Sequence, residues 1–215
     1  MRRPRVLMAD DHSLILAGLR KLVEAECDVV GAVEDGRALV EAAQKLRPDL
    51  ILLDISMPLL NGLDAARQLR KLVPESKVIF LTMHASPTYA TEAFQAGASG
   101  YLLKRSAASE LSLAIRSVLQ GQHYLTPSLT KDVLESVLKP STGEAGKAAC
   151  ATLTDRQREV LQLVAEGHGT KEIATILNVS VKTVEFHKSR VMQQLDLHTI
   201  ADLTKYAITH GITGL

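Results

Sequence analysis

The chain has few of the residues that mark several large classes of protein. It contains two cysteines, Cys27 and Cys150, and no tryptophan, and only 3% of its 215 residues are aromatic. Two cysteines so far apart do not suggest a disulfide framework or a metal site, so we expect free thiols. No apolar run approaches the ~20 residues of a membrane span, and no apolar signal segment follows the basic residues 1–5. The sequence therefore predicts a cytoplasmic protein with no membrane partner.

An excess of charge of one sign is also lacking. The chain has 25 basic and 24 acidic side chains, which gives a formal net charge of +1. Domains that bind nucleic acid commonly carry a strong basic excess, so any DNA contact must come from local clustering. The apolar content of 46% is enough for real hydrophobic cores. A chain of this length is comfortable for two small domains.

The first part of the chain alternates strand-like and helix-like segments, as in a βα repeat. Amphipathic stretches with apolar residues at helical spacing separate apolar runs that are typical of buried strands. Short right-handed crossovers would join these runs into one five-stranded parallel sheet, doubly wound with helices on both faces, over residues 1–121. The predicted strands are 5–9, 28–33, 49–53, 78–82 and 100–103.

The composition changes after residue 121. Residues 122–151 have linker composition with one possible short helix, and residues 152–215 show helical patterns only. Thr154 and Gln157 form a capping-box pair ahead of the first of these helices. Two further helices joined around Asn178 suit a helix-turn-helix, with the second running over 180–195.

Polar side chains follow four of the five predicted strands. Asp10 and Asp11 follow the first strand, Asp54 follows the third, Thr82 ends the fourth and Lys104 follows the fifth. Ligands of open parallel sheets bind at the carboxyl ends of the strands, where the strand order reverses. A regular sheet would therefore gather three carboxylates, a hydroxyl and one ammonium group in a single crevice.

The charge of this crevice favours a metal ion and a phosphoryl group. Two carboxylates ~4 Å apart repel by ~4 kcal/mol at an effective dielectric constant of about 20, so a cation or protonation must relieve them. Oxygen ligands favour Mg²⁺, and Lys104 suits phosphate oxygens. The alternative is that Asp11 or Ser13 caps the next helix and Asp54 merely starts a loop.

The set Asp10-Asp11, Asp54-x-x-Met57-Pro58, Thr82 and Gly100-Tyr101-x-x-Lys104 resembles the receiver domain of bacterial two-component response regulators. The resemblance covers residues 5–121 and implies a flavodoxin-like fold. It also implies that Asp54 accepts a phosphoryl group from a histidine kinase.

The resemblance assigns roles around Asp54 as well. Asp11, Asp54 and the backbone carbonyl of Ser56 would bind Mg²⁺ directly, and Asp10 would act through water. Thr82 and Lys104 would bind the phosphoryl oxygens, and Tyr101 would rotate inward on phosphorylation. Arg105 stands where many receivers carry proline, and we expect His84 to be a surface or switch-loop histidine rather than a phosphocarrier.

The C-terminal part resembles the LuxR-type DNA-binding domain, so that the whole chain resembles the NarL/FixJ subfamily of response regulators. The motif is Leu153-Thr154-x-Arg156-x-Arg158-Glu159-Val160-Leu161, Gly167, Lys171-Glu172-Ile173-Ala174, Val179-Ser180 and Thr183-Val184-x-x-His187. The departures are Gln157 for the usual glutamate, Gly169-Thr170 for the common Ser-Asn, and Gln194 for a frequent lysine. The last lowers the expected affinity for phosphate.

The 180–195 helix is expected to lie in the major groove. At 100° per residue Val184, Val191 and Leu195 share a core face. An exposed Phe186 would contact a thymine methyl group and Glu185 would accept from cytosine N4, or Phe186 tucks against another domain. The predicted DNA contacts are Lys182, Thr183, Glu185, Phe186, Lys188, Ser189 and Arg190.

The last helix carries an apolar stripe that includes Ile200, Leu203 and Ala207. This stripe packs within its own domain or pairs across a two-fold axis, and we expect a homodimer when the chain is phosphorylated. Pairing of two copies would double the phosphate contacts of a modestly basic helix.

The sequence therefore predicts a response regulator in which a histidine kinase phosphorylates Asp54 and so controls binding to promoter DNA. Its own chemistry would be limited to Mg²⁺-dependent self-phosphorylation and dephosphorylation. One alternative is an aspartyl-phosphate phosphohydrolase, although such enzymes usually need a second acid where Ser56 stands. Another is a receiver that acts only through protein partners.

Overall fold

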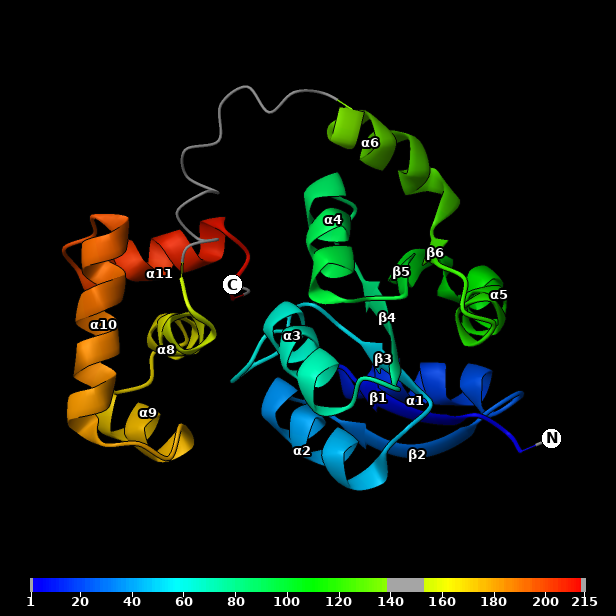
Figure 1. Ribbon diagram of the computed structural model, residues 1–215, viewed down its shortest axis with the longest axis horizontal. Coiled ribbons are helices and arrows are strands. Elements are labelled where there is room, and N and C mark those ends of the chain that lie inside the picture. Colours follow the sequence, from blue (N-terminus) through cyan, green and yellow to red (C-terminus); the bar gives the residue numbers. More distant parts are fainter. Residues whose placement is uncertain (1, 139–152, 214–215) are drawn as a thin grey trace. The chain divides into compact units, whose positions relative to one another are not determined.

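The computed structural model describes residues 2–138 and 153–213, which form two compact units. Each unit has its own core and is described by itself (Figure 1). Cys150 and residues 139–151 of the predicted linker lie outside the described residues, whereas Cys27 is a buried free thiol, as predicted.

The first unit is built on a parallel sheet with the strand order β2-β1-β3-β4-β5-β6. The chain passes from β1 outward to β2 and then crosses to β3 on the other side of β1, so the strand order reverses between β1 and β3. All five predicted strands are confirmed, with ends that differ by one residue at most. They are β1 (Arg5–Ala9), β2 (Asp28–Val33), β3 (Leu50–Leu53), β4 (Lys77–Thr82) and β5 (Gly100–Leu103).

A sixth strand, β6 (Tyr124–Leu125), extends the five that were predicted. It pairs in parallel with β5, Gly100 opposite Tyr124 and Tyr101 opposite Leu125. Two residues are too few to show a strand pattern in a sequence. The helix α6 (Pro127–Leu138) follows and confirms the short helix expected there.

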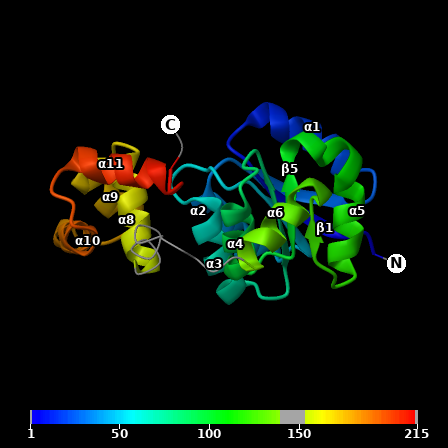
Figure 2. The same cartoon turned by 90° about the horizontal axis from the view of Figure 1, so that it is seen from above.

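Helices cover both faces of the sheet. The helices α1 (Ser13–Val23) and α5 (Ala107–Leu119) lie on one face, and α2 (Gly36–Leu46), α3 (Gly62–Leu72) and α4 (Pro87–Ala96) lie on the other (Figures 1 and 2). All four residues of β3 are buried, as expected for a strand covered on both sides. This confirms the doubly wound α/β architecture.

The second unit contains four helices within the described residues: α8 (Asp155–Ala165), α9 (Thr170–Ile176), α10 (Val181–Leu195) and α11 (Ile200–Thr209). The Thr154–Gln157 capping box starts α8 as predicted, and the Ser180 side chain caps α10 by accepting from Thr183 N. Val184 and Val191 are buried in the core of this unit and Leu195 lies partly buried beside it. No helix in the described part of the chain is long and apolar enough to cross a membrane.

Candidate functional site

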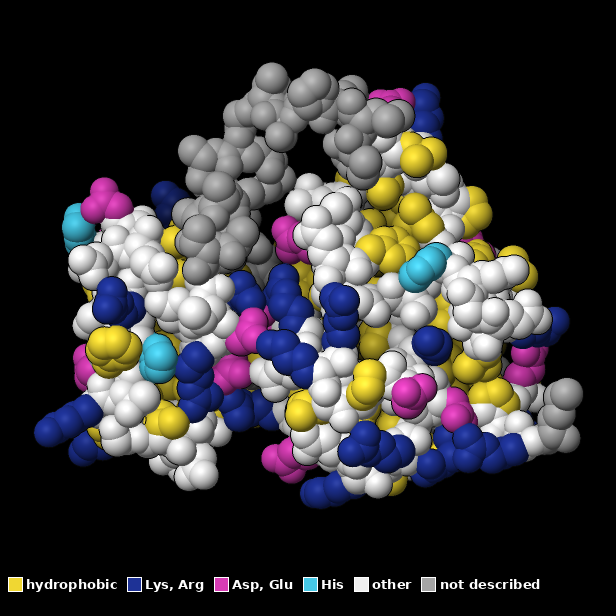
Figure 3. All heavy atoms as spheres, viewed as in Figure 1, with side chains coloured by type: hydrophobic (Ala, Val, Ile, Leu, Met, Phe, Trp, Pro, Cys, Tyr) yellow, Lys and Arg dark blue, Asp and Glu magenta, His cyan; other side chains and the backbone are white. Residues whose placement is uncertain are grey.

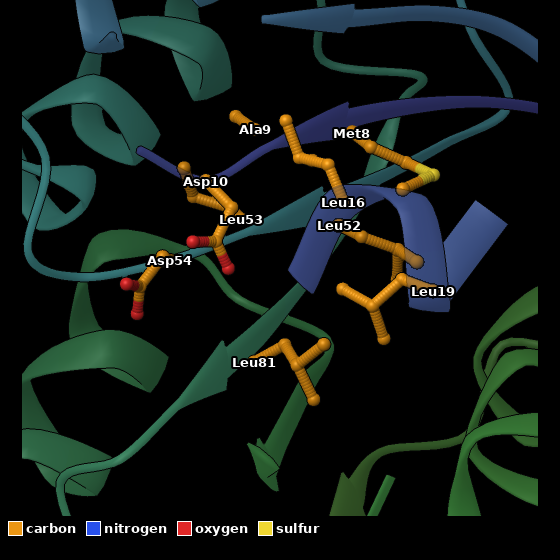
Figure 4. Close-up of a pocket in the computed structure, with 9 residues that line it drawn as sticks. All are labelled: Met8, Ala9, Asp10, Leu16, Leu19, Leu52, Leu53, Asp54 and Leu81. Carbon is orange, nitrogen blue, oxygen red and sulfur yellow. The ribbon is translucent and has the colours of Figure 1, made fainter. Parts of the chain in front are cut away.

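Two buried carboxylates share one ammonium group at the carboxyl ends of the sheet. Asp10 follows β1 and Asp54 follows β3, and they are only 2% and 4% exposed. Lys104 Nζ lies 2.7 Å from Asp10 Oδ2 and 2.8 Å from Asp54 Oδ2. Figure 4 shows both carboxylates at this edge, with the apolar side chains of Leu16, Leu19 and Leu81 nearby. The crevice predicted from the sequence therefore forms, with its charges in contact.

Asp11 and His12 extend this cluster toward solvent. One ligand atom from each of Asp10, Asp11, His12 and Asp54 lies within 4.8 Å of the others. His12 Nδ1 is 2.8 Å from Asp11 Oδ1, and the His12 backbone N–H donates to Asp10 Oδ1 at 3.0 Å. The N-cap of α1 is His12, with no capping hydrogen bond from its side chain, so neither Asp11 nor Ser13 occupies the cap position. Sequence reasoning missed His12, although it directly follows the acidic pair.

The protonation of the cluster follows from burial and shared charge. Burial raises the pKa of Asp54, and this outweighs the lowering by the Lys104 ammonium group. Burial alone would lower the pKa of Lys104, but its hydrogen bonds to Asp10 and Asp54 hold the pKa above its ordinary value. Lys104 is therefore charged at neutral pH. One ammonium group cannot neutralise three carboxylates, and this oxygen-rich donor set suits a small divalent cation.

The backbone after β3 is held close to Asp54. Ile55 N donates to Asp54 Oδ1 at 2.8 Å, and Gly62 N donates to Ile55 O at 2.8 Å. A Cβ added to Gly62 would lie 2.0 Å from the carbonyl oxygen of Asp54. The loop between β3 and α3 therefore needs glycine at this position.

Thr82 and Tyr101, two further residues predicted for the site, form hydrogen bonds with the loop after β4. Thr82 is fully buried at the end of β4, and its Oγ1 accepts from His84 N at 3.2 Å. Tyr101 is also fully buried, and its hydroxyl donates to His84 O at 2.8 Å. The Tyr101 ring therefore points inward in this structure, and its rotation on phosphorylation stays a prediction. Burial raises the pKa of the Tyr101 hydroxyl well above its ordinary value, so it acts as a donor.

His84 has a larger structural role than the sequence indicated. Its Nε2 lies 2.9 Å from Ser56 Oγ, and its ring stacks on Tyr89 with centroids 4.4 Å apart. The switch-loop position expected for His84 agrees with this placement. The sequence did not reveal that His84 contacts two parts of the site. Its ring contacts Ser56, which follows β3, and its backbone carbonyl accepts from the hydroxyl of Tyr101 on β5.

The second unit presents the polar face of α10 to solvent. Lys182, Glu185, Ser189 and Arg190 are exposed, and Phe186 is 57% exposed despite its apolar ring. The Arg190 guanidinium lies 5.5 Å from the centroid of the Phe186 ring. In the space-filling view, basic and apolar side chains lie side by side over α10 (Figure 3). Thr183 and Lys188, also predicted contacts, are partly buried.

Glu185 connects the two helices of the helix-turn-helix. Its Oε1 accepts from Lys188 Nζ at 3.1 Å and from Thr170 Oγ1, on α9, at 3.0 Å. The bonds from Lys188 and then Thr170 lower the pKa of Glu185, which is therefore ionised. The departure at Thr170 thus has a structural role that the sequence did not reveal.

Two protein-family models match this chain. The response regulator receiver domain matches residues 6–116, and the luxR family of bacterial regulatory proteins matches residues 151–207. The response regulator UvrY of Escherichia coli (strain K12) is 34% identical over 209 residues, covering 96% of this chain and 94% of that protein. The chain belongs to the response-regulator family.

Other similar proteins agree with this assignment. The oxygen regulatory protein NreC of Staphylococcus epidermidis is 38% identical over 213 residues, covering 95% of this chain and 96% of that protein. A structure of RcsB from Salmonella enterica serovar Typhimurium, bound to a promoter in the presence of a phosphomimetic, has a TM-score of 0.59 at 29% identity. The match covers 99% of this chain and 100% of the RcsB chain. The chain is thus a response regulator with a receiver domain and a LuxR-type DNA-binding domain, as predicted.

The structure adds detail to two features of this response regulator, the apolar stripe of α11 and the position of Gln194. Leu203 and Ala207 follow the first alternative for the stripe, packing within their own domain. Leu203 and Ala207 are 1% and 0% exposed and belong to the core of their own domain, whereas Ile200 is 59% exposed. Gln194 Oε1 accepts from Gln157 Nε2, so the two glutamines that depart from the family pattern contact each other. The lower phosphate affinity expected from Gln194 stays a prediction, and Gln194 has in addition a structural role between α8 and α10.

Proposed function

We propose that Asp54 is the phosphoacceptor of this response regulator and that a histidine kinase supplies the phosphoryl group. The observation that carries the proposal is the contact of Lys104 Nζ with both Asp10 and Asp54. An Asp54 carboxylate oxygen attacks the phosphorus of the donor, and the bond from phosphorus to the donor's leaving group breaks. Lys104 and the Thr82 hydroxyl then bind the phosphoryl oxygens as a charged and a neutral partner.

We further propose that the carboxylates hold Mg²⁺. Asp11, Asp54 and the backbone carbonyl of Ser56 would be its direct ligands, with Asp10 acting through water. The close grouping of the carboxylate oxygens supports this set, and Mg²⁺ commonly combines a few carboxylates with water and phosphate oxygens. When bound, the ion supplies positive charge that neutralises the phosphoryl oxygens. Self-phosphorylation and dephosphorylation of Asp54 would be the whole of the protein's own chemistry.

We propose that α10 reads promoter DNA and that residues 152–215 form the DNA-binding domain. The predicted linker begins at residue 122, but β6 and α6 belong to the first unit, so the receiver extends beyond residue 121. Lys182, Thr183, Lys188, Ser189 and Arg190 would contact phosphates or base edges, with Phe186 against a thymine methyl group. Glu185, held by Thr170 and Lys188, would orient α10 as well as face a cytosine. The three basic side chains of 182–190 against one acidic one are few, which supports a phosphorylated homodimer that doubles the contacts. Ile200 is the exposed residue of the stripe predicted to pair in this dimer. A cytoplasmic location would suit a protein whose partners are a histidine kinase and promoter DNA.

Phosphorylation with a small donor tests the assignment of Asp54. Incubation with acetyl phosphate and Mg²⁺ should add one phosphate, measured by intact mass. EDTA or Asp54→Asn should abolish the addition, while the exposed control Asp28→Asn should leave it unchanged. Undiminished labelling of Asp54→Asn would show that another residue accepts the phosphoryl group.

A further inference from the structure

The segment that follows α5 holds the outer edge of the strand that leads to Lys104. Thr126, the residue after β6, is 1% exposed. Its backbone N–H donates to Tyr101 O at 3.0 Å, and its side-chain Oγ1 accepts from Leu103 N at 3.1 Å. Thr126 thus binds β5 on both sides of Leu102.

The Thr126 hydroxyl takes the place of a strand partner. The strand β6 ends at Leu125, so the amide of Leu103 lies beyond the last paired residue of β6. A buried amide without an acceptor is costly, and native structures rarely leave one. Thr126 Oγ1 provides the acceptor one residue before Lys104, and this bond fixes the backbone from which the lysine side chain departs.

We propose that Thr126 is a positioning residue for Lys104. The proposal rests on the proposed role of Lys104 in binding the phosphoryl group on Asp54. Lys104 Nζ reaches carboxylates that follow two other strands, at 2.7 Å and 2.8 Å. A misplacement of about 1 Å in such a site can slow a reaction by roughly 100-fold. Thr126 contacts neither carboxylate and acts only through β5.

Removal of the Thr126 hydroxyl should slow phosphoryl uptake without weakening the binding of Mg²⁺. The proposed ligands of Mg²⁺ are held by β1 and β3, which Thr126 does not contact, whereas the phosphoryl ligand Lys104 follows β5. The alternative is a purely structural role for Thr126 in packing and in capping α6. Leu129 N donates to Thr126 O at 2.9 Å at the start of this helix. That bond uses the backbone, so Thr126→Val retains it and the side-chain shape while removing the hydroxyl.

The experiment uses the full chain with Thr126→Val, Thr126→Ser, Lys104→Ala and the double variant Lys104→Ala/Thr126→Val. Three quantities are measured: the rate of phosphorylation by acetyl phosphate with Mg²⁺, the Mg²⁺ affinity by calorimetry, and amide exchange of Leu103 by NMR. Thr126→Val should be phosphorylated about tenfold more slowly, with no loss of Mg²⁺ affinity and faster exchange of the Leu103 amide. Thr126→Ser should behave as the wild type. In the Lys104→Ala background, Thr126→Val should cause no further slowing.

The outcomes distinguish the two levels of the proposal. A wild-type rate in Thr126→Val, while Lys104→Ala is slow, would overturn the role of Thr126 alone. Equal slowing in the valine and serine variants, or a parallel loss of Mg²⁺ affinity, would assign Thr126 to packing and also overturn it. A wild-type rate in Lys104→Ala would overturn the proposed role of the lysine, and the positioning role with it.

Discussion

At the scale of single residues, the charge of Lys104 decides what the site can bind. Its ammonium group touches Asp10 and Asp54, which are both buried, and Asp11 adds a third carboxylate at the solvent side. A phosphoryl group on Asp54 would bring additional negative charge into the same space. Lys104 can leave the carboxylates and bind the phosphoryl oxygens only if another cation neutralises the carboxylates. Phosphorylation should therefore need a divalent ion.

Gly62 gives a prediction about the loop that holds Asp54. In Gly62→Ala the added methyl group would lie 2.0 Å from Asp54 O, so the loop must shift. We expect phosphorylation by acetyl phosphate to slow by at least about tenfold, measured by intact mass against time. The control is Gly18→Ala in α1, where no atom lies within 4 Å of the added carbon. Wild-type kinetics in Gly62→Ala would show that the position of the Asp54 backbone does not limit the reaction.

Phe186 gives a prediction about base recognition. Sites are first selected from random duplex DNA, and each thymine is then replaced by deoxyuridine, which lacks the methyl group. One replacement should weaken binding by about 0.8 kcal/mol, or about fourfold, and the effect should vanish in Phe186→Ala. Ile200→Ala, which removes another exposed apolar side chain, should retain the effect. Equal affinity for every deoxyuridine duplex would place Phe186 away from the bases.

At the scale of secondary-structure elements, the pair Gln157–Gln194 joins α8 to α10. Gln157 uses its whole amide, because Oε1 accepts from Thr154 N while Nε2 donates to Gln194 Oε1. Family members with glutamate and lysine at these positions would place an ion pair where this chain has an amide pair. The two departures are therefore explained together as one neutral contact.

This contact predicts coupled effects on the stability of the helical domain. Gln194→Lys brings a donor against the Gln157 amide donor and should destabilise the domain by ~1 kcal/mol. Adding Gln157→Glu should restore the loss, with a coupling energy of ~0.5–1 kcal/mol in urea unfolding. Gln193→Lys, on the exposed side of α10, should show no coupling to Gln157→Glu. Additive effects of the two glutamine substitutions would mean that the contact contributes nothing to stability.

The elements differ in how far the sequence could predict them. The long apolar runs of β1, β3 and β4 were predictable because strands buried on both faces carry apolar side chains without interruption. The site residues Asp10, Asp54 and Lys104 were predictable because each follows such a run. The strand β6 has only two residues, and the bond of Thr126 to Leu103 depends on tertiary pairing that no periodicity records. The bond between Glu185 and Thr170 likewise depends on how α9 packs on α10.

At the scale of the whole molecule, the two domains have separate cores and separate tasks. The receiver core lies between the sheet and its helices, and the core of the DNA-binding domain lies among α8, α9, α10 and α11. The proposed phosphorylation of Asp54 would therefore act on DNA binding through an equilibrium between states of the whole chain. We propose a docked state, in which the receiver restrains the DNA-binding domain, and an undocked or dimeric state.

The size of this switch sets what phosphorylation must supply. Moving the population from 99:1 to 1:99 needs ~5.5 kcal/mol of differential stabilisation, which a few charge-assisted hydrogen bonds from Lys104 and Thr82 to the phosphoryl group can provide. Residues 150–215 alone should then bind DNA without any phosphoryl donor. The full chain should reach comparable affinity only with beryllofluoride and Mg²⁺, measured by mobility shift. Full-length Asp54→Asn serves as the control and should not respond to beryllofluoride. If the full wild-type chain binds equally well with and without beryllofluoride, the receiver does not restrain the DNA-binding domain, although α10 would still be its DNA-reading helix.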